Sequence, residues 1–131
     1  MKVELFTLCD FAQENDGKLT IVGTFDTIVA REFPCTHPIL SVVVRLRFDL
    51  WEFGSHTFRV ETRDLDGESL LSPIKGSLEV RGVGNATAVS HVLFNISGAH
   101  FKSSGVTSFV LFIDDKEIAT IPLYLRLHGQ K

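Results

Sequence analysis

The sequence predicts an all-β fold, an antiparallel β-sandwich of about eight strands that is immunoglobulin-like or jelly-roll-like. The clearest sign is the C-terminal segment, in which two apolar arms, 106–113 and 118–125, flank the polar residues 114–117. Both arms are apolar on both faces, which is typical of strands buried inside a layered β protein. Elsewhere, short apolar runs alternate with clusters of Gly, Pro, Asp and Asn, without an amphipathic helix or an internal repeat. Proline-marked crossings favour a sandwich over a barrel.

The size and composition indicate a single domain, residues 1–131. Of the 131 residues, 44% are hydrophobic and 11 are Phe. A chain of this size can bury about two thirds of its unfolded surface without a metal or a disulfide. We therefore expect Cys9 and Cys35 to be reduced thiols, and we expect no cofactor.

The charge and the N-terminus indicate where the protein acts. The net charge is −3. The chain therefore lacks the positively charged surface that binding to a nucleic-acid backbone requires. No apolar run approaches the roughly 18 residues of a membrane span. The first residues carry a charge at position 4 and do not resemble a secretory signal. The expectation is a cytoplasmic protein that binds neither nucleic acid nor membranes.

The N-terminal segment predicts a hairpin. Residues 3–8 alternate as a first strand, and residues 19–25 form the second. Between them, Asp16-Gly17 is a strong hairpin signal because both residues tolerate positive φ. Gly23 indicates a bulge or a close backbone approach. Residues 26–38 contain two prolines and are expected to be a connection that crosses from one sheet to the other.

The next two runs predict a pair of neighbouring strands, 39–50 and 56–64. In the first strand, alternation directs Val42, Val44, Leu46, Phe48 and Leu50 inward and Ser41, Val43, Arg45, Arg47 and Asp49 outward. In the second strand, Phe58 and Val60 are expected to face the core. Opposite charges favour a register with Asp49 beside Arg59 and Arg47 beside Glu61. The arginines then form either a solvated charge ladder or an anion-binding face.

The remainder completes the set of strands. A turn is expected at 64–67, then an edge strand or loop at 68–74, interrupted by Pro73. A short strand is expected at 77–81, followed by a flexible turn at 82–85. A longer strand over 86–96 is expected to end at Ser97-Gly98, before the C-terminal hairpin.

Several short segments, most of them turn and core positions, form a recognisable combination. They are CDFA at 9–12, NDGKL at 15–19, IVGTFD at 21–26, FP at 33–34, GSH at 54–56 and DLDG at 64–67. With the C-terminal strand and turn, this set resembles a family of small bacterial proteins classed as a domain of unknown function. The resemblance implies a bacterial, stand-alone β-sandwich. It carries no known activity, cofactor or catalytic residue.

The candidate binding residues lie in the loop between the two central strands: Trp51, Glu52, Phe53 and His56. Two large aromatic residues there form either an exposed tip for a partner or a cap that folds back over the sandwich. His56 and Glu52 are also the residues closest to an acid/base pair. A loop-closing hydrogen bond explains His56 equally well.

No motif of a known enzyme is found, and no His or Cys spacing matches a metal site. The leading hypothesis is therefore a non-catalytic binding or assembly module. It would act through a sheet edge or the Trp51 loop, with a protein partner or a second copy in a homodimer. The alternative is a small-ligand or metal-binding domain that uses loop histidines and the aspartates Asp64, Asp66, Asp114 and Asp115.

Overall fold

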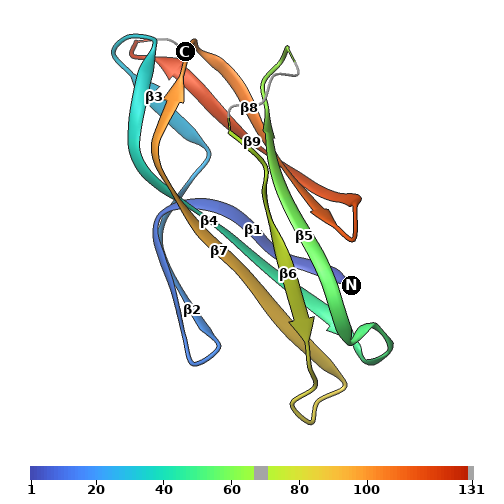
Figure 1. Cartoon of the computed structure of the whole chain (residues 1–131). Helices are drawn as coiled ribbons and strands as arrows, with labels where there is room; N and C mark the ends of the chain where they lie inside the picture. The colour runs from blue at the N-terminus through green and yellow to red at the C-terminus, as the bar shows by residue number, and fades with distance from the viewer. Residues whose placement is uncertain (67–70, 130–131) are drawn as a thin grey trace.

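The computed structural model describes residues 1–66 and 71–129, and it is all-β as the sequence predicts. Two sheets pack face to face (Figure 1). The strands are β1 (Lys2–Asn15), β2 (Lys18–Phe25), β3 (Thr27–Ala30), β4 (Cys35–Asp49), β5 (Gly54–Arg63), β6 (Ile74–Val80), β7 (Thr87–Phe101), β8 (Gly105–Ile113) and β9 (Lys116–Leu127), with one 3-10 turn, η1 (Leu50–Glu52). Sheet A has the order β2-β1-β4-β7, and sheet B has the order β3-β9-β8-β5-β6. All pairs are antiparallel except β3 with β9.

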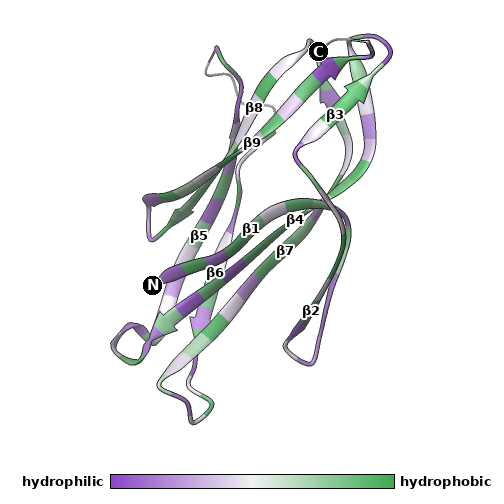
Figure 2. Ribbon diagram, turned by 180° about the vertical axis from the view of Figure 1, so that it is seen from behind, coloured by the Kyte–Doolittle hydropathy of each residue, from purple (hydrophilic) through white to green (hydrophobic). Residues whose placement is uncertain are grey.

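The main core lies between the two sheets, and apolar side chains alternate with polar ones along most of the strands (Figure 2). Phe48 and Leu46 of β4 are fully buried there, against Phe109 and Leu111 of β8 and Leu123 of β9. The inward direction predicted for Val42, Val44, Leu46 and Phe48 is therefore confirmed. The prediction for Leu50 is wrong, because β4 ends at Asp49 and Leu50 enters η1, where it is exposed.

The C-terminal hairpin has the predicted turn, with positive φ at Asp114 (51°) and Asp115 (63°). Only one of its arms is buried on both faces. In β8, Val110 and Phe112 are buried although they face outward, and the Arg59 guanidinium lies 4.1 Å from the centre of the Phe112 ring. β9 is exposed on its outer face, because its other neighbour is the four-residue β3 and none of the strands in the described residues packs over it.

The predicted pairing of 39–50 with 56–64 is wrong, because β4 and β5 belong to different sheets. β4 pairs with β1 and β7, and β5 pairs with β6 and β8. Charge complementarity misled the prediction because each arginine finds a carboxylate elsewhere. Arg47 bonds Glu4 of β1 at 2.7 Å, and Arg59 bonds Glu61 of its own strand at 2.7 Å.

The connection 26–38 was predicted to cross from one sheet to the other, but it crosses to sheet B as β3 and returns, because β2 and β4 both belong to sheet A. Residues 27–30 form β3, which runs parallel to β9, and β4 begins at Cys35. Pro38 is tolerated within β4 because β1 pairs with β4 only as far as Ser41. The proline therefore has a strand neighbour, β7, on one side only.

The N-terminal hairpin bends out of sheet A. β1 extends to Asn15, beyond the predicted 3–8, and the turn has positive φ at Asp16 and Gly17 as expected. Gly23 has φ 70°, and a Cβ there would lie 2.4 Å from the Asp10 carboxylate, so the close-approach interpretation is confirmed with a side chain as the neighbour. The hairpin packs against the outer face of sheet A, where its Leu19 and Ile21 contact the cluster around Val43.

A second, smaller apolar cluster fills the space under this hairpin. Val43 was predicted to face outward and does so, yet it is fully buried with Cys9 and Ala12. Leu19 and Ile21 of β2 pack against them. The burial of Val43 therefore depends on a layer that strand alternation does not reveal.

β7 continues past the predicted end at Gly98. The glycine has φ 64°, and the strand changes its inward face there, since Ile96 is buried before it and Ala99 and Phe101 are buried after it. β6 begins at Ile74, so the expected strand at 77–81 starts earlier. Part of the expected 64–67 turn and of the 68–74 segment lies outside the described residues.

Cys9 and Cys35 are free thiols. In the described part of the chain, no helix has the length and hydropathy to cross a bilayer.

Candidate functional site

The predicted site lies at one end of the sandwich, where η1 follows β4. The Asp49 N–H donates to Glu52 Oε1 at 2.9 Å, and the Phe53 N–H donates to the Leu50 carbonyl at 3.3 Å. These bonds close one tight turn. The Glu52 carboxylate also accepts from the Met1 α-amino group at 2.7 Å, which with the Asp49 N–H lowers the pKa of Glu52.

The two aromatic residues of the loop have different environments. Phe53 turns inward and packs on the main core, where a Cβ on Gly82 would lie 2.8 Å from its ring. Trp51 points into solvent and is 83% exposed. The cap interpretation therefore holds for Phe53, and the exposed-tip interpretation holds for Trp51.

Two further apolar side chains lie exposed at the same end. Leu50 is 62% exposed, and Val83, in the loop between β6 and β7, is 79% exposed. This loop and η1 lie side by side at the lower end of the molecule in both views (Figures 1 and 2), consistent with the packing of Gly82 against Phe53. We call Leu50, Trp51 and Val83 the Trp51 tip. In the sequence, Val83 stands between Gly82 and Gly84, and this segment was predicted only as a flexible turn.

His56 fastens the tip to the rest of the molecule. Its Nδ1 bonds the Asp114 carboxylate at 2.6 Å, and its Nε2 bonds the Glu52 carbonyl oxygen at 2.6 Å. Both partners are acceptors, so both ring nitrogens carry hydrogen and the imidazole is cationic. Asp114, followed by the Glu52 carbonyl, raises the pKa of His56, and His56 in turn lowers the pKa of Asp114. The loop-closing interpretation of His56 agrees with these contacts.

The contacts of His56 and Glu52 favour the loop-closing interpretation over an acid/base pair. The ring meets the backbone carbonyl of Glu52, whereas the Glu52 carboxylate is occupied by the Asp49 N–H. His56 further stacks on buried Phe48, with ring centres 4.7 Å apart. This arrangement holds the loop in place.

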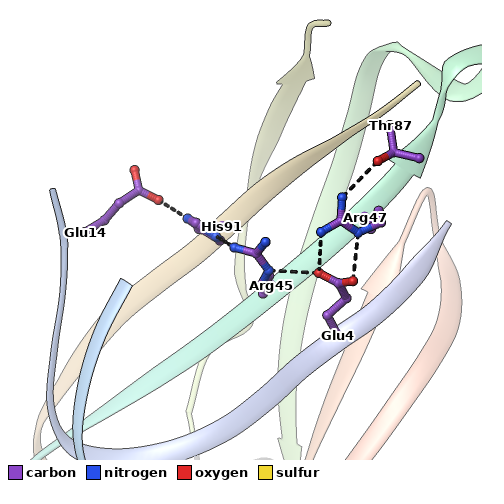
Figure 3. Close-up of polar contacts among 6 residues, drawn as sticks. All are labelled: Glu4, Glu14, Arg45, Arg47, Thr87 and His91. Atoms are coloured by element: carbon purple, nitrogen blue, oxygen red, sulfur yellow. Dashed lines mark hydrogen bonds and ion pairs between the residues drawn. The ribbon is translucent and has the colours of Figure 1, made fainter. Parts of the chain in front are cut away.

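A second polar cluster, which the sequence analysis missed, lies on the outer face of sheet A (Figure 3). β1 has a register shift between Val3 and Leu5, and the Glu4 carboxylate there bonds Arg45 at 2.8 Å and Arg47 at 2.7 Å. Arg47, then Arg45, lower the pKa of Glu4 to about 2. Both arginines thus share one carboxylate of the protein itself, which favours the charge-ladder interpretation over the anion-binding face.

The same cluster latches the N-terminal hairpin onto the sheet. The Arg45 guanidinium donates to His91 Nε2 at 3.0 Å, and His91 Nδ1 bonds the Glu14 carboxylate (Figure 3). A guanidinium can only donate, so Nε2 accepts and Nδ1 carries the hydrogen given to Glu14. The His91 side chain is only 4% exposed, which makes this latch different from an ion pair in which both side chains are exposed.

The loop aspartates of the alternative site do not gather in one place. Asp114 and Asp115 lie at the β8–β9 turn near His56, whereas Asp64 and Asp66 follow the opposite end of β5. Asp64 and Asp66 line a cavity of about 350 Å³ together with His100, Lys102 and the buried Phe101. Among residues 1–66 and 71–129, no three His, Cys, Asp or Glu side chains are placed to hold a metal ion.

Comparison with known proteins shows the family of the chain. No curated protein matches the sequence. A family model described as "Family of unknown function (DUF6941)" matches residues 4–126. Because the match spans nearly all nine strands and both loops of the Trp51 tip, the resemblance predicted from the turn and core motifs is confirmed, and the chain belongs to this family of unknown function.

Proposed function

We propose that the protein is a non-catalytic binding module whose Trp51 tip docks into an apolar groove of a protein partner. The observation that carries the proposal is the 83% exposure of Trp51, the single tryptophan of the chain. Burying such a side chain in the core would stabilise the fold, whereas here it is held in water. Tryptophan is the residue type most enriched at the energetic centre of protein interfaces.

The local structure supports docking by a preformed surface. η1 is closed by its own backbone bonds and fixed to the β8–β9 turn through His56. A rigid tip loses little conformational entropy on binding, so more of the contact energy appears as affinity. Acidic residues Asp49 and Glu52 and the net charge of −3 disfavour an anionic membrane surface as the occupant.

The test is affinity capture from an extract of the source cells with the wild-type chain and Trp51→Ser as baits. We expect the variant to lose the partner, because removal of a central tryptophan costs at least about 2 kcal/mol, roughly thirtyfold in affinity. Leu65→Ser is the matched control, since Leu65 is 81% exposed and lies beyond the opposite end of β5. Equal capture by Trp51→Ser and the wild type would refute the proposal.

A second candidate function rests on the cavity beside Asp64 and Asp66. Its polar rim and buried apolar floor suit a small polyhydroxylated ligand, and its volume of about 350 Å³ is at the lower end for such sites. A thermal-shift series with monosaccharides, Ca²⁺ and Zn²⁺ tests it. A rise in melting temperature that Asp66→Asn abolishes would support this function, and a flat response would remove it.

A further inference from the structure

The four sheet edges of the sandwich are not alike. Sheet A ends in β2 and β7, and sheet B ends in β3 and β6. Edge strands expose unpaired backbone N–H and C=O groups, and proteins protect them by shortness, charge, proline or distortion. Three of these edges have such protection. β3 has only four residues, β6 contains Lys75 and Glu79, and β2 contains Lys18 and the positive-φ Gly23.

β7 is not short, not charged and not interrupted by proline, and its one distortion, the positive-φ Gly98, leaves the stretch from Thr87 to Ser97 undistorted. It runs for 15 residues, TAVSHVLFNISGAHF, without Asp, Glu, Lys, Arg or Pro. At about 3.4 Å per residue it is roughly 50 Å long. β4 pairs with it from Thr87 to Phe101 on one side, and no described strand hydrogen-bonds to its other side. The distribution of protective features therefore singles out β7 as the edge that is left available for pairing.

We propose that β7 pairs antiparallel with β7 of a second copy of this chain, so that two sheets A join into one continuous eight-stranded sheet across a twofold axis. A twofold axis places the strand opposite itself, and like charges opposite one another would oppose the pairing. A strand without charged residues avoids this repulsion in every register. Eight strands lie within the usual size of a sheet, and two identical edges have the same twist.

The side chains around the edge are compatible with this partner. The latch between His91 and Glu14 joins two side chains, so it uses none of the backbone N–H and C=O groups of β7. Leu93 and Phe94 are only partly buried, and a neighbouring strand would cover them further. The proposal is independent of the Trp51 tip, which lies on η1 and the β6–β7 loop.

Sedimentation equilibrium of the full chain tests the proposal. We expect a species of twice the 14.6 kDa chain mass for the wild type. Val89→Lys/Ser97→Lys places two lysines on the outward side of β7, symmetric about Leu93, which is next to the central residue Phe94. It should raise the dimer dissociation constant at least about tenfold, because like charges then meet across the twofold axis. Thr20→Lys/Val22→Lys adds the same charge to the β2 edge as a matched control and should dimerise like the wild type.

Hydrogen exchange of the wild-type chain locates the interface and does not depend on any variant folding well. Amides of β7 should become more protected as protein concentration rises, and the amides of the β2 and β6 edges should not. Circular dichroism of the lysine variants verifies that they are folded. The proposal is overturned if the wild-type chain stays monomeric over a roughly 100-fold range of concentration that reaches its solubility limit. A dimer whose concentration-dependent protection lies outside β7, or one that Trp51→Ser dissociates, also overturns it.

Discussion

Two histidines show how hydrogen-bond partners assign opposite roles to the same side chain. His56 lies between two acceptors, Asp114 and the Glu52 carbonyl, and is cationic. His91 lies between a donor, Arg45, and an acceptor, Glu14, and uses one nitrogen in each role. The sequence offered five histidines without a metal-ligand spacing. Only the Glu52 carbonyl is a sequence neighbour of its histidine. The other three partners, Asp114, Arg45 and Glu14, come from distant strands or turns, so neither role follows from the local sequence alone.

The His56 contact predicts a pH-dependent stability. Its pKa is raised in the folded protein, so its contribution is complete below the unfolded value of about 6.5 and is lost as the pH rises through the folded value. His56→Gln should be less stable than the wild type at about pH 6, by about 1 kcal/mol because Asp114 is half exposed. The difference should shrink as the pH rises through the raised pKa of His56 in the folded protein. Urea unfolding across this range is the measurement, and a difference independent of pH would contradict it.

Glu4 predicts the opposite dependence. Its pKa is lowered from 4.5 to about 2 by Arg47 and Arg45, so its contribution is present above 4.5 and is lost as the pH falls toward about 2. Glu4→Gln should therefore be less stable than the wild type at neutral pH, and the two should converge in acid. Urea unfolding at a series of pH values from neutral to strongly acidic measures the convergence. A gap that stays constant down to the lowest pH would show that the ion pairs contribute nothing.

At the scale of elements, the N-terminal hairpin shields part of the outer face of sheet A from solvent. The turn at Asp16-Gly17 was predictable because both residues adopt the positive φ that the motif demands. The packing of the hairpin on sheet A was not predictable from the sequence. It depends on the positive φ of Gly23 and on the burial of Val43 beneath Leu19 and Ile21. Alternation along β4 describes the direction of Val43 and not what covers it.

This layer predicts that Val43 behaves as a core residue. Val43→Ala should lower the free energy of unfolding by about 1–3 kcal/mol, because a cavity remains under the hairpin. Val22→Ala, on the half-exposed face of the same hairpin, should change it by less than about 0.5 kcal/mol. Denaturant unfolding of both variants is the measurement. Equal effects of the two substitutions would mean that the hairpin does not rest on the sheet in solution.

For the whole molecule, the all-β class was predictable, whereas the sheet to which each strand belongs was not. Turn residues and short apolar runs marked most strands, but β3 was missed because its four residues pair in parallel with the distant β9. Charge patterning placed β4 beside β5, although their arginines have closer partners within each sheet. At the candidate site, the sequence left two alternatives for Trp51, exposed or folded back, and the structure shows it exposed. The part of Val83 in the Trp51 tip could not be predicted, because it depends on two loops that meet only in the folded chain.

The sandwich predicts that the chain unfolds in one cooperative step. Both sheets contribute to the same apolar core, so neither retains its buried face without the other. Far-ultraviolet circular dichroism and near-ultraviolet circular dichroism should therefore give the same urea midpoint. Two separate midpoints would show that the sheets form independent units and would contradict the single domain expected from the sequence.

The position of Trp51 has a practical consequence. The only indole of the chain is already in water when the protein is folded, so its fluorescence emission should change little when the chain is denatured. The same emission should shift to shorter wavelength when the ring enters an apolar environment. The native sequence therefore contains its own optical reporter, which is nearly silent to unfolding and responsive to docking, so that any purified partner can be titrated without a label.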